Sequence, residues 1–288
     1  MSMRHVLVVI AGLTVAASGL AACGDDESTN PGGDGATTSS PSSSALPSSS
    51  ATPATASVVA YLVRDEKVAP VRRSGAAATP ARAALEALLQ GPTGSEASAG
   101  LTSAIPTGTT LLGVDIADGV ATVDLSTEFG SGGGSLSMQE RVAQVVYTVT
   151  QFSTAQKVLF HVDGKAVAAL GGEGLILGSP QARSDWEAMT PAILLESPLP
   201  GDTVTSPFDI TGTANTFEAV FRASLTDSSG ATLHDDSVTA TSGTGTRGTF
   251  SQAITFTGAT HGTGTLKVYE ASAKDGSEIN VVSIAVSL

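Results

Sequence analysis

Thr79-Pro-Ala-Arg-Ala-Ala-Leu-Glu-Ala-Leu-Leu-Gln-Gly-Pro92 carries the strongest structural signal in the first half of the chain. Thr79 and Pro80 suit the N-cap and the first position of a helix, and Gly91 before Pro92 suits its end. Apolar residues recur between them at i, i+3, i+4, i+7 and i+8, which places Ala81, Ala84, Leu85, Leu88 and Leu89 on one stripe. The spacing predicts an amphipathic helix that ends with Gly91 in a left-handed conformation.

Short β-branched runs surround this helix. Extended segments are predicted at 58–63 and 68–72, a hairpin at 111–125 that turns at Asp118-Gly119, and a further strand at 157–162. Ser137-Met-Gln-Glu140 has capping-box spacing and predicts a second helix, whose buried face is Val142, Val145, Val146 and Val149. The order predicts an α+β domain over residues 58–178, with two helices packed on one face of a small sheet.

The last third of the chain has a different pattern, with apolar and small residues alternating at period two. Strand-like runs occur near 192–196, 208–213, 217–226, 232–240, 248–256, 263–273 and 278–288. They predict an all-β, immunoglobulin-like sandwich over residues 191–288. A connector at 179–190 contains the lone Trp186, which we expect to be buried; an exposed recognition aromatic is the alternative.

Composition narrows the function. The 288 residues include 27 acidic and 14 basic side chains, a formal net charge of −13, and such an excess repels phosphate backbones. Nucleic acid is therefore not an expected partner. The single cysteine excludes an intrachain disulfide and a cysteine-based zinc site.

The first residues read as an export signal. Arg4 precedes the apolar run 6–15, and the stretch ends in Leu20-Ala-Ala-Cys23, which resembles the lipobox of bacterial lipoproteins. The resemblance implies that residues 1–22 are a signal peptide and that Cys23 is the lipid-attachment residue. An ordinary secretory signal with a free thiol and an uncleaved anchor are the alternatives. Residues 23–57 are rich in Ser, Thr, Pro, Gly and Ala, which predicts a disordered tether.

The first folded module also resembles a known family. Leu89-Gln-Gly-Pro92, the stretch 100–108, the run 118–126, and Tyr147-Thr-Val-Thr150 before Val162-Asp-Gly164 look like the GerMN domain of spore-germination and sporulation proteins. The resemblance covers essentially the whole module. It implies an interaction role, similar to that of ring-building modules in envelope assemblies, and it brings no catalytic residues.

The second module resembles the immunoglobulin-like domain that accompanies GerMN in germination-associated lipoproteins. The matching stretches are Glu196-Ser-Pro-Leu-Pro-Gly201, Ser206-Pro207, the run 212–218, Gly248-Thr-Phe250 and Ala273-Lys-Asp-Gly276. The two resemblances occur in the usual order behind a lipobox, so they support each other.

Three patterns are candidates for chemistry. His161 and Asp163 are two apart on a predicted strand and are expected to share a face. No nucleophile elbow accompanies them, so His161 is interpreted as a solvated histidine at the end of a strand, and a charge-paired dyad is the alternative. His234-Asp235-Asp236 offers metal-ligand atoms without spaced partners and is interpreted as a charged hairpin tip. The glycine-rich stretch 130–135 lacks the Gly-Lys-Ser/Thr of a phosphate loop and is interpreted as a flexible linker.

From these observations we expect a non-enzymatic lipoprotein on the outer face of the bacterial cell membrane, which binds other envelope proteins or cell-wall polymer. We expect no catalytic, metal-binding or cofactor-binding residues, and no small-molecule substrate is evident. The alternative is a lipid-tethered hydrolase acting on cell-wall material, which requires a carboxylate pair or a nucleophile in a cleft.

Overall fold

The structure, a computed structural model, describes residues 54–171, 174–258 and 261–288. They belong to the unit Ala51–Leu288, which is distinct from Met1–Ser50. The predicted signal peptide at 1–22, the attachment residue Cys23 and nearly all of the predicted tether at 23–57 lie outside the described residues. Within the described ranges, no helix has the length and hydropathy of a membrane span.

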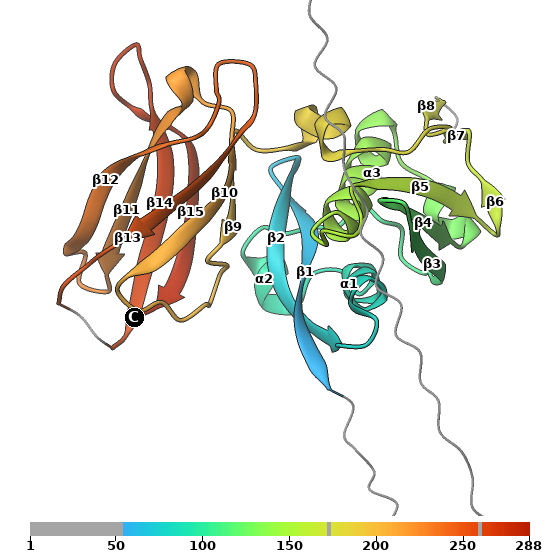
Figure 1. Ribbon diagram of the computed structural model, residues 1–288, viewed down its shortest axis with the longest axis horizontal. Helices are drawn as coiled ribbons and strands as arrows, with labels where there is room; N and C mark the ends of the chain where they lie inside the picture. The colour runs from blue at the N-terminus through green and yellow to red at the C-terminus, as the bar shows by residue number, and fades with distance from the viewer. Residues whose placement is uncertain (1–53, 172–173, 259–260) are drawn as a thin grey trace, which may run out of the picture. The chain divides into compact units, whose positions relative to one another are not determined.

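The first element is a long antiparallel hairpin of β1 (Thr55–Arg64) and β2 (Lys67–Ala76) (Figure 1). Asp65 and Glu66 form its two-residue turn, and both have positive φ (50° and 62°), as a tight hairpin turn requires. Strand pairing starts at Thr55, earlier than the predicted module start at 58, because Thr55 pairs with the far end of β2.

Helix α1 (Pro80–Leu89) begins and ends where the sequence predicts. Thr79 occupies the N-cap, although its side chain makes no capping hydrogen bond. Gly91 has a φ of 71°, and its N–H donates to the Leu88 carbonyl at 2.9 Å, which confirms the predicted left-handed end. A short helix that was not predicted, α2 (Gly94–Ser98), follows.

A four-stranded sheet with the order β3-β4-β5-β6 comes next. Its strands are β3 (Leu111–Ala117), β4 (Val120–Leu125), β5 (Lys157–Val162) and β6 (Lys165–Ala166). β4 and β5 are parallel, so a crossover must join them, and helix α3 (Ser135–Val149) supplies it. The short pair β7 (Ala169–Leu170) and β8 (Leu175–Ile176) follows the sheet.

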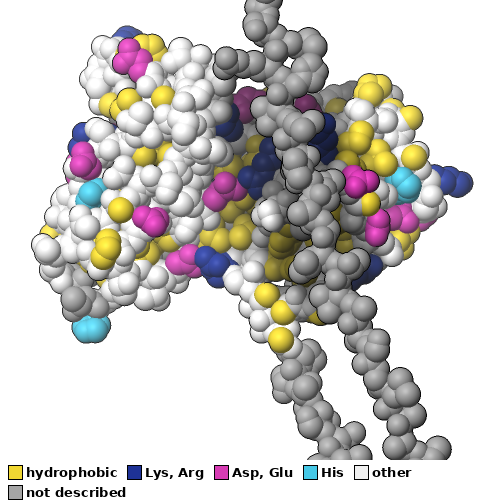
Figure 2. Space-filling model, in the orientation of Figure 1, with side chains coloured by type: hydrophobic (Ala, Val, Ile, Leu, Met, Phe, Trp, Pro, Cys, Tyr) yellow, Lys and Arg dark blue, Asp and Glu magenta, His cyan; other side chains and the backbone are white. Residues whose placement is uncertain are grey.

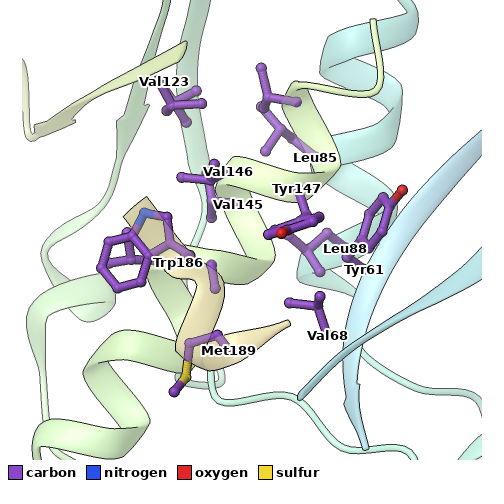
Figure 3. Packing of buried hydrophobic residues seen from close by; sticks show 14 of the residues in the cluster. Tyr61, Val68, Leu85, Leu88, Val123, Val145, Val146, Tyr147, Trp186 and Met189 are labelled. Carbon is purple, nitrogen blue, oxygen red and sulfur yellow. The ribbon is translucent and has the colours of Figure 1, made fainter. Parts of the chain in front are cut away.

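Helix α3 is buried around its whole circumference from Arg141 to Val149. Figure 1 shows it between the hairpin β1–β2 and the sheet, and in Figure 3 Val123 of β4 and Tyr61 of β1 lie on opposite sides of it. The predicted α+β class is confirmed. The extended segments form separate sheets, because the hairpin β1–β2 does not pair with β3–β6.

The start of α3 differs from the prediction. Ser137 was expected to cap this helix, but the helix begins at Ser135 with Gly134 in the N-cap position, so the predicted capping box is wrong. The 3-10 turn η1 (Thr127–Gly130) leads into this region.

Arg141 explains the glycine-rich stretch 130–135. Its side chain is 2% exposed, and burial lowers the pKa of its guanidinium. The guanidinium donates to four carbonyl oxygens, those of Phe129 (2.6 Å), Ser131 (3.0 Å), Gly132 (3.1 Å) and Ser137 (3.3 Å). Gly133 lies against it with a φ of 82°, and a Cβ there would come within 2.8 Å of Arg141 Nη2. The stretch is an ordered loop that wraps around a buried cation, so its interpretation as a flexible linker is wrong.

The second module is a sandwich of two antiparallel sheets, as predicted. One sheet has the order β13-β10-β9 and the other β12-β11-β14-β15. The strands are β9 (Ile193–Ser197), β10 (Phe208–Ala214), β11 (Val220–Asp227), β12 (Thr232–Thr239), β13 (Gly248–Ile254), β14 (Thr263–Ala271) and β15 (Glu278–Ser287). Phe221 and Phe250 meet edge-to-face between the sheets, with ring centroids 4.9 Å apart.

The segment that joins the modules packs into both. Trp186 lies in the 3-10 segment η2 (Arg183–Met189) and is 5% exposed within the first module's core, so the exposed-aromatic alternative is wrong (Figure 3). In β9, Leu194 belongs to the same core, whereas Ile193 and Leu195 belong to the core of the sandwich. Successive side chains of a strand point to opposite sides, so β9 anchors both modules.

Polar contacts reinforce this junction. Arg183 lies over the Tyr147 ring at 4.6 Å and pairs with Glu196 of β9 at 2.7 Å. Glu196 also accepts a hydrogen bond from the buried Tyr61 hydroxyl, whose pKa is raised by burial. A second pair at the junction joins Arg247 Nε to Glu187 at 2.8 Å.

Gly91 tests the account of helix α1. We expect Gly91→Ala to lower the free energy of unfolding by about 1–2 kcal/mol, because a Cβ disfavours the left-handed conformation while the space around it is open. Gly94→Ala is the matched control, since that position is equally open and has no positive φ. Urea denaturation of the two variants measures the difference, and equal stabilities contradict the assignment.

The Glu187–Arg247 pair predicts a pH dependence. The hydrogen bond from Arg247 holds the pKa of Glu187 below its usual value, against the opposing effect of burial. A depressed pKa contributes stability above the ordinary carboxyl pKa of about 4.3, and this is lost as the pH falls through the folded value. We expect Glu187→Gln to lower the free energy of unfolding at pH 7, with a deficit that shrinks on acidification. Denaturation across a pH series measures this, Glu86→Gln on α1 is the control, and a pH-independent deficit contradicts it.

Candidate interaction groove

His161 and Asp163 do not share a strand face, so the alternative of a dyad is wrong. β5 ends at Val162, and Asp163 has a φ of 48°, so it belongs to the turn and does not share a strand face with His161. The strand register places His161 beside Asp124, whose carboxylate accepts the Gly164 N–H at 3.0 Å. The Asp124 carboxylate beside His161 therefore stabilises the turn at Gly164.

His234-Asp235-Asp236 lies within β12, so its interpretation as a hairpin tip is wrong. His234 Nδ1 is 3.1 Å from the Thr255 carbonyl oxygen, and Asp235 pairs with Arg222 at 2.7 Å. Over residues 54–171, 174–258 and 261–288, no three His, Cys, Asp or Glu side chains are grouped to hold a metal ion.

Polar side chains on α3, and Gln151 just after its end, form hydrogen bonds with the backbone along one edge of the hairpin. Thr148 Oγ1 accepts the Tyr61 N–H at 3.0 Å, and Gln144 Nε2 donates to the Tyr61 carbonyl at 3.1 Å. Gln151 binds both backbone groups of Val59, accepting from its N–H at 2.9 Å and donating to its carbonyl at 2.6 Å. Gln144 and Thr148 are fully buried. Helix side chains thus take the place of a neighbouring strand along β1.

The opposite edge of the hairpin, along β2, has no strand paired with it, although Val68 is only 2% exposed. Val59 and Tyr61 turn their backbone groups toward α3, so their partners across the hairpin, Arg72 and Pro70, turn theirs outward, as does Val68. In the described part of the chain, the Val68 amide and carbonyl and the Pro70 carbonyl have no hydrogen-bond partner. Proline has no N–H, which is one way that proteins limit pairing at an exposed edge.

A second edge without a paired strand belongs to β9, although its residues 193–195 are buried. The Asn215 N–H donates to the Ala192 carbonyl at 2.8 Å, so Ala192 and Leu194 face the neighbouring strand β10. Alternate residues of a strand face opposite edges, so Ile193 and Leu195 direct their amides and carbonyls away from β10.

A third open edge belongs to β15. Its end is covered, because the Ala285 carbonyl accepts from Gly201 at 2.8 Å and the Ser287 N–H donates to Asp202 at 2.8 Å. Ser283 faces the same edge by alternation, but no such cover reaches it within the described ranges.

These three edges line one groove of about 300 Å³. β2 contributes Val68, Ala69 and Pro70, β9 contributes 193–195, and β15 contributes 280–284. Val281 is 47% exposed there. In the space-filling view, apolar side chains are visible between the sandwich and the hairpin, next to basic and acidic ones (Figure 2).

Side chains at the hairpin turn place two cations, Arg64 and Lys67, and one carboxylate, Asp65, at one end of the groove. Arg64 Nη2 donates to the Ala99 carbonyl at 3.3 Å, while its Nε is buried without an acceptor among the described residues. Lys67 Nζ donates to the Ala188 carbonyl at 2.6 Å. Asp65 lines the same end and forms no ion pair with either cation.

The sequence patterns did not locate this groove. One signal was available, since Pro70 inside a predicted strand marks an edge. The walls come from segments more than 100 residues apart, and no local pattern reports that they meet.

Comparisons with known proteins agree with the architecture. Residues 46–168 match the Germane model, described as "Sporulation and spore germination", and residues 192–277 match Gmad2, the "Immunoglobulin-like domain of bacterial spore germination". No curated protein matches the chain significantly.

Solved structures show partial similarity. The first GerMN domain of the sporulation protein GerM from Bacillus subtilis is 29% identical and covers 45% of this chain and 99% of its own, with a TM-score of 0.38. The tandem GerMN domains of the same protein are 20% identical over 69% of this chain and 61% of theirs, with a TM-score of 0.39. A protein from Clostridium perfringens described as a lipoprotein is 24% identical over 48% and 93%, with a TM-score of 0.35.

The family models confirm both resemblances found in the sequence: the chain carries a GerMN-like domain of the Germane family, followed by a Gmad2 immunoglobulin-like domain.

Proposed function

We propose that this protein is a non-enzymatic component of the bacterial envelope, which is held on the outer face of the membrane by a lipid on Cys23 and captures another envelope protein. The observation that carries the proposal is the groove of about 300 Å³, where Val281 is 47% exposed and Arg64, Asp65 and Lys67 also line the walls. An exposed apolar surface rimmed by polar groups is a common binding site for protein.

The lining of the groove favours protein over wall polymer. None of its described lining residues is aromatic, whereas aromatic rings are the usual stacking platforms for sugars. The groove combines apolar side chains with charged ones at one end, as the side chains of a polypeptide ligand also do. The histidines lie on separate elements, with His161 on β5, His234 on β12 and His261 in a loop, so they do not converge on one site.

The anchor rests on the sequence. The apolar run 6–15 and Leu20-Ala-Ala-Cys23 place the only cysteine of the chain at the lipobox position. The predicted tether at 23–57 then separates the folded unit from the bilayer. The families of the two domains connect the protein with sporulation and spore germination.

Replacing Cys23 tests the anchor. We expect Cys23→Ser to abolish incorporation of a radiolabelled fatty acid and to move the protein from the membrane fraction to the medium, because the serine cannot form the thioether to diacylglycerol. Labelling and fractionation of cells that express each form measure both effects. Unchanged labelling, or an unmodified mature N-terminus at another residue, contradicts lipidation at Cys23.

Crosslinking tests the groove. We expect a photoreactive p-benzoylphenylalanine in place of Val281 to form an adduct with one protein in intact cells, identified by mass spectrometry. The matched control is the same residue in place of Leu112 on β3, since these side chains are 47% and 49% exposed and only Val281 lines the groove. Adding Ser283→Trp should remove the adduct by filling the groove. No protein adduct at position 281, or an equal one at 112, contradicts the proposal, and an adduct with glycan indicates wall polymer.

A further inference from the structure

Exposed apolar side chains gather at the end of the sandwich where β11 begins and β14 ends. Seven large apolar side chains are exposed in the described part of the chain, and four of them lie at this end: Phe217, Val220, Ile279 and Val281. These four residues are called the apolar cap. Resting on the proposed function, we propose that the apolar cap extends the contact beyond the groove and binds a protein surface that is apolar at its centre and places a lysine or arginine at Glu218.

A buried carboxylate joins the two segments of the apolar cap. Glu270 of β14 is 8% exposed, and its two oxygens accept from the Phe217 N–H and from Asn280 Nδ2, each at 2.8 Å. Glu270 is also the strand partner of Ile279 on β15. The turn that carries Phe217 is thereby held beside β15, whose Val281 lines the groove. The apolar cap and the groove therefore adjoin.

The turn that presents Phe217 has a fixed backbone. Glu218 and Ala219 have positive φ (53° and 61°), a conformation that costs free energy in residues other than glycine. The Glu218 N–H donates to Thr244 Oγ1 at 2.9 Å, and the Ala219 N–H donates to the Thr216 carbonyl at 3.2 Å. An aromatic side chain on such a turn is 54% exposed and already in place, so binding costs it little conformational entropy.

The charges around the apolar cap favour a basic protein surface over a membrane. Residues 217–220 and 270–281 contain four carboxylates and one amine, a formal net charge of −3. Lys267 pairs with one of these carboxylates, that of Glu278, at 2.6 Å, which still leaves the region negative. Surfaces that bind anionic lipid head groups are instead rich in Lys and Arg.

Glu218 gives this charge a position. It follows Phe217 directly, is exposed, and forms no ion pair with any described residue. A cation on the partner beside the apolar contact complements this carboxylate and fixes the orientation of the two surfaces.

Selection from a displayed library of random twelve-residue peptides tests the partner chemistry, with residues 24–288 as bait. Peptides that bind the Phe217→Ser form of the bait are removed first, so that ligands of the apolar cap are kept. We expect the remaining peptides to combine aromatic or aliphatic residues with Lys or Arg. No enrichment after this step, or an acidic consensus, overturns the inference.

Binding of the synthetic consensus peptide, measured by fluorescence anisotropy, tests the other contacts of the apolar cap. We expect Ile279→Ser and Glu218→Lys each to weaken binding by about tenfold or more, as for residues at the centre of a contact. Leu136→Ser on α3 is the matched control for Ile279, because these side chains are 40% and 41% exposed. Glu128→Lys on η1 is the control for Glu218, since both are exposed and unpaired among the described residues.

Circular dichroism checks the fold of each variant. If Ile279→Ser does not fold, Glu218→Lys, which changes one exposed side chain, tests the apolar cap. Losses that the control variants share, or no loss for either variant of the apolar cap, overturn the inference.

Cosedimentation with vesicles of phosphatidylethanolamine and phosphatidylglycerol tests a membrane as the occupant. We expect residues 24–288 to stay in the supernatant. Sedimentation that Phe217→Ser abolishes overturns the inference and assigns the apolar cap to lipid. An adduct at position 281 in cells without enrichment of basic, apolar peptides refutes this partner chemistry alone, whereas the absence of any adduct there refutes the proposed function.

Discussion

The row of Gln144 and Thr148 on α3 and Gln151 just after its end is the contact on which the first module depends. A two-stranded hairpin has little stability of its own and exposes two edges of backbone groups. The polar row satisfies one edge with side-chain hydrogen bonds, at Val59 and Tyr61, while the rest of the helix buries apolar side chains. The hairpin is thereby fixed to the helix without joining the sheet β3–β6, and β2 keeps a free edge.

Strand β9 determines what that free edge faces. Its period-two alternation sends Leu194 into the core of the first module and Ile193 and Leu195 into the core of the sandwich. The pairing of Arg183 with Glu196 reinforces the attachment. The groove wall is thus held by buried side chains, and removal of the second module would also take Leu194 out of the first core. The two modules are structurally coupled, although their sequence patterns are independent.

The features that were predicted from the sequence depend on local order. The end of helix α1 was predictable, because the backbone preferences of Gly91 and Pro92 act locally. The strands of the sandwich were predictable from the alternation of apolar and small residues. Arg141 shows why the start of α3 was missed: the capping-box spacing at Ser137 is local, but the helix begins where a buried guanidinium draws in the glycine loop. The groove could not be predicted, because its lining residues Pro70, Leu194 and Val281 lie far apart in the sequence and no local pattern brings them together.

Amide hydrogen exchange, resolved by residue with NMR, tests the central claim that helix side chains close one edge of the hairpin and leave the other open. The account predicts strong protection of the Val59 and Tyr61 amides, which donate to Gln151 and Thr148, and fast exchange of the Arg72 amide, which faces the opposite edge at an exposed residue. Protection of Arg72 equal to that of Tyr61 in the free protein, or fast exchange of Tyr61, would contradict it.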